Sequence, residues 1–166
     1  MLLTAISTAG VVQGKNAMGP SEANAPDQPI GPSSAVTAIV GDDHEAARSR
    51  IREILEEMGI RVIAESTNGE LLLDAVARLR PQLVTVDMRM PGLNGLIVTE
   101  RVKQSHPEIR VFIVTNYPNE HYRRAAEKVG ADAFIAKADA YAGLKGAIQQ
   151  WRGSGQKGSK GSSQTE

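Results

Sequence analysis

The chain contains no cysteine among its 166 residues. Without thiols, disulfide bonds, thiolate metal sites and a cysteine nucleophile are all excluded. The 19 basic and 19 acidic side chains cancel to a formal net charge of +0, so the overall charge does not indicate binding to nucleic acid or to an anionic membrane. No apolar stretch approaches the roughly 20 residues that a membrane-spanning helix needs, and we expect no contact with a membrane.

The start of the chain bears only a weak likeness to a secretion signal. The run Met1–Ile6 is mostly apolar, but Thr4 interrupts it and the first basic residue is Lys15. A signal peptide opens with a positively charged region, which this chain lacks. We therefore expect the protein to be cytoplasmic.

Composition divides the chain into a central segment and two ends. Residues 14–35 are rich in glycine, proline and small polar residues, and such segments bury too little apolar surface to offset the entropy lost on ordering. Residues 153–166 are a Gly/Ser/Lys sequence of the linker type. We expect a flexible leader over 1–35, one folded domain over 36–152 and a flexible tail over 153–166.

The central segment alternates short β-branched runs with stretches of helical spacing. The runs are typical of strands buried on both faces and cover residues 36–41, 61–64, 83–86, 111–114 and 133–136. Between them apolar residues recur at helical intervals, and Gly59, Pro81, Pro107 and Gly130 mark the ends of four helices. Five successive strand–helix units predict an α/β fold: a parallel sheet with helices on both faces.

Candidate site residues follow four of the five predicted strands. The pair Asp42–Asp43 follows the first strand, Asp87 the third, Thr115 the fourth and Lys137 the fifth. The carboxyl ends of parallel strands open onto one crevice, where ligands bind. The strand order 2-1-3-4-5 brings all these residues together, whereas the order 3-2-1-4-5 would separate Asp87 from the fourth strand. We therefore predict the order 2-1-3-4-5.

Three carboxylates at one edge of the sheet predict a site for a divalent cation. At a separation of about 4 Å and an effective dielectric constant near 20, each like-charged pair costs about 4 kcal/mol. Mg2+ suits a site of carboxylate and carbonyl oxygens. An aspartate oxygen beside Mg2+ is suited to accept a phosphoryl group, which the Lys137 ammonium and the Thr115 hydroxyl would stabilise.

Each of these residues also has a purely structural interpretation. Asp42 or Asp43 would serve as the N-cap of a helix that begins at His44. A single Thr or Lys at a strand end is usually a surface residue. The joint arrangement at four strand ends favours the functional interpretation.

Four parts of the chain resemble the motifs of response-regulator receiver domains, the CheY-like superfamily. These are Val40–His44, Val86–Gly95, Thr115 and Phe134–Lys137, and the resemblance covers residues 36 to about 152. It implies a flavodoxin-like, doubly wound (βα)5 fold with a parallel five-stranded sheet. It also implies a response regulator of two-component signal transduction, a regulatory phosphoacceptor rather than an enzyme.

The resemblance implies a role for each acidic residue. Asp87 would accept a phosphoryl group from a histidine kinase or a histidine phosphotransfer protein. Mg2+ would be bound by Asp43, Asp87, the backbone carbonyl of Arg89 and, directly or through water, Asp42.

The same resemblance implies roles for residues around the acidic cluster. Thr115 and Phe134 match the switch pair, and Lys137 matches the lysine that pairs with the phosphoryl group. Arg89 and Tyr117 occupy the two positions that tune the lifetime of the phosphorylated state. Since both side chains are large, we expect a long-lived phosphoprotein.

Two residues depart from the usual receiver pattern. Ala138 follows the lysine, where many receivers have a proline after a cis bond, and a cis bond before a non-proline residue costs about 3 kcal/mol. Asn116 stands where many receivers have a small residue. Neither departure removes a chemical group from the site.

The sequence also bears on partners and on other functions. Because 14 residues follow Arg152, too few for a helix-turn-helix or an enzymatic domain, we expect no direct contact with nucleic acid. Output is expected through protein contacts made by the surface of Tyr122–Lys128 and Tyr141–Trp151. Two alternatives remain: a degenerate receiver that binds partners without phosphorylation, and a phosphohydrolase of the haloacid dehalogenase type, which expects an aspartate where Arg89 stands.

Overall fold

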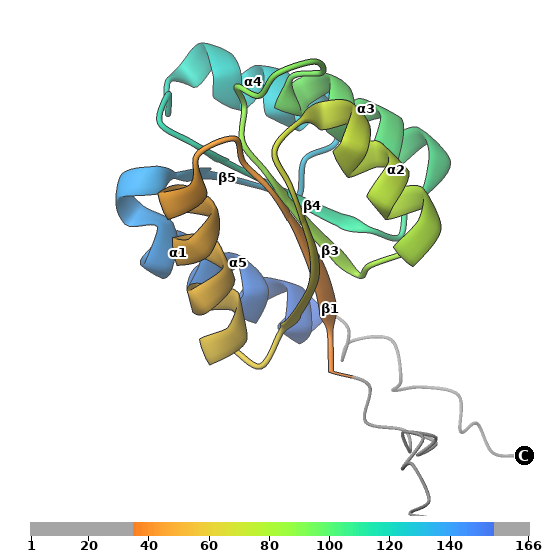
Figure 1. Cartoon of the computed structure of the whole chain (residues 1–166). Coiled ribbons are helices and arrows are strands. Elements are labelled where there is room, and N and C mark those ends of the chain that lie inside the picture. Colours follow the sequence, from red (N-terminus) through yellow and green to blue (C-terminus); the bar gives the residue numbers. More distant parts are fainter. Residues whose placement is uncertain (1–34, 155–166) are drawn as a thin grey trace, which may run out of the picture. The chain divides into compact units, whose positions relative to one another are not determined.

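A computed structural model of the chain describes residues 35–154, and Figure 1 shows the arrangement of its elements. Within this range a single sheet of five parallel strands has the order β2-β1-β3-β4-β5, which confirms the predicted fold and strand order. The strands are β1 (Thr37–Gly41), β2 (Arg61–Ser66), β3 (Leu83–Val86), β4 (Arg110–Thr115) and β5 (Ala133–Ala136).

Helices follow each strand and cover both faces of the sheet. They are α1 (Glu45–Glu57), α2 (Gly69–Leu79), α3 (Gly95–Ser105), α4 (Glu120–Lys128) and α5 (Ala140–Ser154), with a short 3-10 helix η1 (Lys137–Asp139) before the last. Helices α1 and α5 pack on one face, and α2, α3 and α4 pack on the other (Figure 1). The expected leader, except Ala35, and the expected tail from residue 155 onward lie outside the described residues, and α5 runs two residues past the expected boundary at 152.

Alternation along the strands divides the core into two layers. In β1, the side chain of Ile39 belongs to the layer under α2, α3 and α4, while Ala38 and Val40 belong to the layer under α1 and α5. Successive side chains of a strand point to opposite faces of the sheet. Since both faces of β1, β3 and β4 are covered, their sequences are apolar at nearly every position, as the short apolar runs indicated.

Asparagine side chains fix where three of the helices begin. Asn68 before α2, Asn94 before α3 and Asn119 before α4 each accept a hydrogen bond from the backbone N–H three residues further on. This satisfies one of the backbone donors that have no partner in the first helical turn. At the other end, α2 stops at Arg80, whose φ of 47° is left-handed, directly before the expected breaker Pro81.

Among residues 35–154, no helix combines the length and the apolar character needed to cross a bilayer. The expected cytoplasmic location is a separate prediction that this observation does not test.

The neighbouring leucines of α2 provide a test of the packing. Leu72 is fully buried, whereas Leu71 is 57% exposed. Leu72→Ala should lower the free energy of unfolding by about 2 to 5 kcal/mol, because it leaves a cavity in the core. Leu71→Ala, the matched control, should change it by no more than about 0.5 kcal/mol. Urea unfolding followed by circular dichroism measures both, and similar losses would contradict this assignment of the core face.

Candidate functional site

Backbone hydrogen bonds between neighbouring strands hold Asp42 and Asp87 at the ends of β1 and β3. The Asp87 amide donates to the Gly41 carbonyl oxygen at 2.8 Å, and the Asp42 amide donates to the Ser66 carbonyl oxygen at 3.0 Å. Asp42 is 0% exposed and Asp87 5% exposed, while Asp43 is exposed. The site therefore has two buried carboxylates and a third at its rim.

Lys137 brings positive charge to both buried carboxylates. Its Nζ atom lies 2.7 Å from Oδ2 of Asp42 and 3.0 Å from Oδ2 of Asp87. The residue begins η1 directly after β5, so the last strand delivers its side chain to the ends of β1 and β3. No cis peptide bond occurs among the described residues, and the bond between Lys137 and Ala138 is therefore trans.

The pKa values of Asp87 and Lys137 reflect the balance between burial and pairing. Burial raises the pKa of Asp87 above its ordinary value, and Lys137 offsets this only in part. Burial lowers the pKa of Lys137, but its pairing with Asp42 and Asp87 outweighs burial and raises this pKa overall. The ammonium therefore stays charged, and one positive charge faces two buried carboxyl groups.

The remaining oxygen of Asp87 shows that the site fits a cation. Oδ1 of Asp87 is buried and has no hydrogen-bond partner within residues 35–154. A buried carboxylate oxygen without a partner is costly. Asp42, Asp43, His44 and Asp87 each offer an atom to one cluster whose members lie within 4.8 Å of one another. The acidic cluster could therefore bind a metal ion. His44 was not among the ligands expected from the sequence, although its position directly after Asp42–Asp43 could have indicated it.

The helix-capping interpretation of the acidic pair describes only part of the geometry. His44, not an aspartate, occupies the N-cap position of α1, and its side chain makes no capping hydrogen bond. Oδ1 of Asp42 accepts from the His44 amide at 2.9 Å, while Oδ2 of the same carboxylate faces Lys137. Asp42 thus supports the start of α1 and contributes charge to the site.

The loop between β3 and α3 is closed tightly against the end of β3. The Gly95 amide donates to the Met88 carbonyl oxygen at 3.0 Å. A Cβ atom at Gly95 would lie only 2.4 Å from the Asp87 carbonyl oxygen, so this close approach requires glycine. Gly92, with a φ of 76°, makes the turn. The loop thereby holds the segment that carries Arg89 next to Asp87.

Arg89 and Tyr117 join the loops that follow β3 and β4. The Arg89 guanidinium donates to the Tyr117 hydroxyl at 2.9 Å and lies 4.6 Å from the centre of its ring. The Tyr117 amide in turn donates to the hydroxyl oxygen of Thr115 at 3.1 Å. Thr115 is itself 0% exposed. Arg89 and Tyr117, the two residues expected to tune the lifetime of the phosphorylated state, thus contact each other. Their separate positions in the sequence did not reveal this contact.

Phe134 lies on β5, on the side of the sheet that faces α4. Its ring is half-buried against the core layer of α2, α3 and α4. The Arg123 guanidinium of α4 lies 5.2 Å from the ring centre, within the range of a cation–π contact. The aromatic member of the expected switch pair therefore contacts α4 directly.

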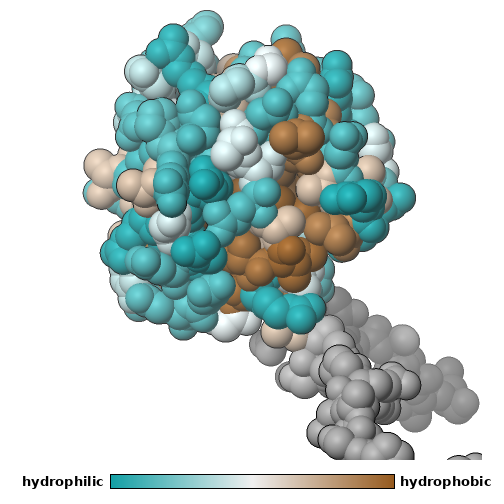
Figure 2. Space-filling view, in the orientation of Figure 1, coloured by the Kyte–Doolittle hydropathy of each residue, from teal (hydrophilic) through white to brown (hydrophobic). Residues whose placement is uncertain are grey.

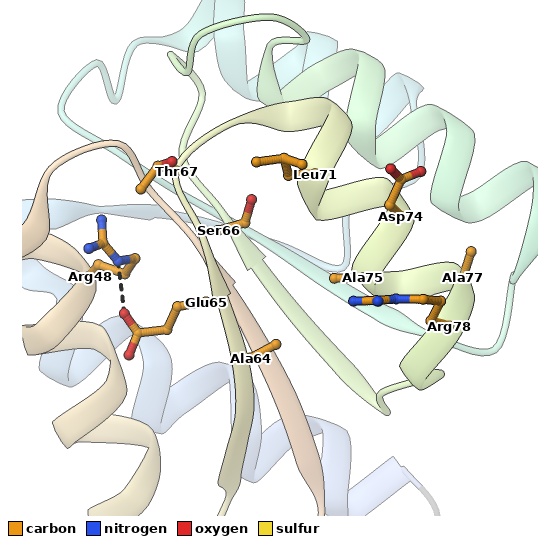
Figure 3. Close-up of a pocket in the computed structure, with 10 residues that line it drawn as sticks. All are labelled: Arg48, Ala64, Glu65, Ser66, Thr67, Leu71, Asp74, Ala75, Ala77 and Arg78. Carbon is orange, nitrogen blue, oxygen red and sulfur yellow. Dashed lines mark hydrogen bonds and ion pairs between the residues drawn. The ribbon is translucent and has the colours of Figure 1, made fainter.

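Apart from the acidic cluster, a surface hollow lies along the edge strand β2. It has a volume of about 670 Å3 and lies between α1 and α2, and Figure 3 shows its lining side chains. Apolar surface gathers along this edge of the molecule (Figure 2). Arg48 links the hollow to the acidic site, since its Nε donates to Glu65 at 2.8 Å and its NH1 donates to the Asp42 carbonyl oxygen at 2.9 Å.

Comparison with known proteins agrees with this fold. The family model of the response regulator receiver domain matches residues 38–149. The chain is 31% identical over 118 residues to response regulator GacA of Pseudomonas viridiflava, a match that covers 70% of this chain and 54% of GacA. A solved structure, the signal receiver domain of the putative response regulator NarL from Mycobacterium tuberculosis, aligns with a TM-score of 0.65 and 25% identity, covering 70% of this chain and 94% of that one.

The curated relatives are longer than the matched region. The chain is 30% identical over 114 residues to the DNA-binding transcriptional activator EvgA of Escherichia coli K12, which covers 69% of this chain and 56% of EvgA. The chain thus spans about half the length of the curated relatives it matches. Since EvgA is described as binding DNA, the comparisons do not support the expectation that nucleic-acid contact is absent.

The raised pKa of Asp87 predicts a pH-dependent effect of Asp87→Asn on stability. The folded protein holds this proton more tightly than the unfolded chain, so stability falls as pH rises from the ordinary pKa of 3.8 through the raised one. A neutral amide removes this cost, and Lys137 keeps its pairing with Asp42. In metal-free buffer the variant should therefore be more stable than wild type at neutral pH, with a gain that shrinks as pH falls through the raised pKa.

Urea unfolding at a series of pH values, with a chelator present, measures this difference. Asp74→Asn changes an exposed carboxylate of α2 and should show no comparable gain. A variant Asp87→Asn that is less stable than wild type at neutral pH would show that the pair with Lys137 outweighs the cost of burial.

Proposed function

The chain belongs to the response regulator receiver domain family, and we propose that Asp87 is the residue on which it accepts a phosphoryl group. Receiver domains of this family act in two-component signalling, which implies a histidine kinase as partner. The observation that carries the proposal is the buried Asp87 carboxylate, which has one oxygen paired with Lys137 and the other without a partner. An uncommitted oxygen is what a nucleophile or a metal ligand needs.

In the proposed transfer, an oxygen of Asp87 attacks the phosphorus of a phosphohistidine on a histidine kinase or a histidine phosphotransfer protein. The phosphorus–nitrogen bond breaks, and its electron pair stays with the imidazole of the donor. The residues around Asp87 have to position the phosphoryl group and balance its charge, because positioning and electrostatics dominate this chemistry. Lys137 supplies a positive charge at the site, and Thr115 supplies a hydroxyl.

Asp43, Asp87 and the Arg89 backbone carbonyl would hold Mg2+, with Asp42 bound to it directly or through water. The ion would neutralise charge on the transferring group. Oxygen donors of this kind suit Mg2+, and the partnerless oxygen of Asp87 provides one.

The function proposed here is regulatory, with no chemistry beyond acceptance and loss of the phosphoryl group. The intact cluster of Asp42, Asp87 and Lys137 favours it over a degenerate receiver that binds partners without phosphorylation. A phosphohydrolase of the haloacid dehalogenase type lacks the second aspartate, since Arg89 stands in its place. We propose that output runs through a protein contact at the surface of Tyr122–Lys128 and Tyr141–Trp151, where Arg123 lies over the ring of the proposed switch residue Phe134.

Phosphorylation should occur on Asp87 alone. Incubation of the full chain with acetyl phosphate and Mg2+ should add one phosphoryl group that is stable in acid and labile in base, as intact-mass spectrometry can record. Asp87→Asn should abolish the adduct, because an amide is not a nucleophile of this kind, whereas Asp74→Asn should keep it. Equal labelling of wild type and Asp87→Asn would refute the assignment, and an unlabelled wild type would favour the degenerate receiver.

Thr115 should couple phosphorylation to the rest of the domain. A phosphoryl group shifts a conformational equilibrium only through contacts that differ between the two states, and the Thr115 hydroxyl supplies such a contact. Thr115→Ala should still be phosphorylated but show smaller NMR shift changes at α4 and β5. Thr115→Ser, which keeps the hydroxyl, should restore them. An undiminished response in Thr115→Ala would mean that the switch uses other residues.

The contact between Arg89 and Tyr117 should prolong the phosphorylated state. Hydrolysis needs a water aligned with the Asp87–phosphorus bond, and two large joined side chains hinder its approach. The double variant Arg89→Asn, Tyr117→Glu should lose phosphate about tenfold faster, which corresponds to about 1.4 kcal/mol in the barrier.

Arg89→Asn alone should give much of this effect, since it removes the guanidinium that makes the contact. Tyr141→Glu changes another exposed tyrosine and serves as the control. The decay of the adduct in Mg2+ buffer measures the lifetimes, and a double variant no faster than wild type would refute the gating role.

A further inference from the structure

A hydrogen bond from the backbone amide of His44 holds this residue beside the acidic cluster. Its amide donates to Oδ1 of Asp42 at 2.9 Å, which fixes the residue at the start of α1. Its ring turns towards Asp43, with Nδ1 2.7 Å from Oδ1 of that residue and 3.7 Å from Oδ1 of Asp42. An imidazole nitrogen thus lies among the oxygens of the candidate metal site.

The spacing of these atoms suits a single coordination shell. With metal–ligand bonds of about 2.0 to 2.2 Å, ligands at adjacent corners of an octahedron lie about 3 Å apart and opposite ligands about 4 Å apart. The atoms of Asp42, Asp43, His44 and Asp87 lie within 4.8 Å of one another. One ion can therefore reach the histidine and the carboxylates together after small side-chain adjustments.

A second observation points independently to a ligand. Oδ1 of Asp87 is buried without a hydrogen-bond partner within residues 35–154, and the whole residue is only 5% exposed. Lys137 occupies Oδ2 of both Asp42 and Asp87. The charge of the cluster is therefore not balanced by protein groups, and the uncommitted oxygen is available to a cation.

The nitrogen changes which cations the site prefers. Mg2+ favours oxygen ligands, whereas imidazole suits first-row transition metals such as Co2+ and Zn2+. Nδ1 can bind a metal only through its lone pair, which requires the neutral tautomer that carries its proton on Nε2. The His44 side chain is 71% exposed, so Nε2 can hydrogen-bond to water in this tautomer.

We propose that His44 gives the acidic site a nitrogen ligand, so that it binds imidazole-preferring divalent ions more tightly than its oxygen ligands alone would, while it still takes Mg2+. The proposal rests on the proposed function for the position of the metal site. It adds a metal preference that comes from this chain's own histidine, and a regulator loaded with a different ion would differ in its phosphoryl chemistry.

The test compares two metals on the full chain, wild type and variants. His44→Phe keeps a ring of similar size and the backbone amide but removes the ligand nitrogen. His121→Phe is the matched control, since His121 is exposed on α4 and the chain has three histidines in all. Visible absorption measures Co2+ affinity and calorimetry measures Mg2+ affinity, while pulsed electron paramagnetic resonance of bound Mn2+ detects a histidine nitrogen directly.

His44→Phe should weaken Co2+ binding by about tenfold or more, change Mg2+ binding by less than about twofold, and abolish the nitrogen signal of Mn2+. His121→Phe should change none of these. Equal losses of Co2+ and Mg2+ affinity in His44→Phe would overturn the proposal, because His44 would then only position Asp43. An unchanged Co2+ affinity in His44→Phe would also overturn it. If the wild-type protein binds Co2+ through a nitrogen ligand and does not bind Mg2+, the histidine ligand is supported and the Mg2+ part of the proposed function is refuted.

Discussion

The structure depends on the burial of two carboxylates, Asp42 and Asp87, around one ammonium group. Lys137 pairs with both, but it cannot balance both, and burial raises the pKa of Asp87. A folded protein tolerates such a cost when a ligand offsets it. Three features of the fold bring these charges together. They are the strand order, the close approach of Gly95 at the start of α3 to Asp87, and the position of Lys137 directly after β5.

The same imbalance links the parts of the site to one another. In the proposed function, a cation would complete the charge of the carboxylates, and a phosphoryl group would bring new negative charge towards Lys137 and Thr115. Two further contacts lie in neighbouring parts of the fold: Arg89 with Tyr117 joins the loops after β3 and β4, and Arg123 of α4 lies over the ring of Phe134 in β5.

Sequence reasoning predicted the parts of this design that depend on residue order. The positions of Asp42, Asp87, Thr115 and Lys137 after separate strands predicted the strand order, because 2-1-3-4-5 brings them together and the alternative order 3-2-1-4-5 does not. Contacts that depend on side-chain conformation could not be predicted. An example is the contact of the His44 ring with Asp43. The left-handed backbone conformation of Arg80 at the end of α2 could not be predicted either. Strand ends place side chains near one another, but rotamers and loop conformation decide which atoms meet.

The central claim is that the acidic cluster carries excess negative charge that a divalent cation offsets. The most direct test is the shift in melting temperature with increasing Mg2+, measured for wild type, Asp43→Ala and the control Asp74→Ala. Mg2+ that binds only the folded state should raise the melting temperature of wild type and of the control. Asp43→Ala should lose this response and melt at or above the wild-type temperature without metal, because carboxylate repulsion is reduced. Wild-type Mg2+ affinity in Asp43→Ala would contradict the account.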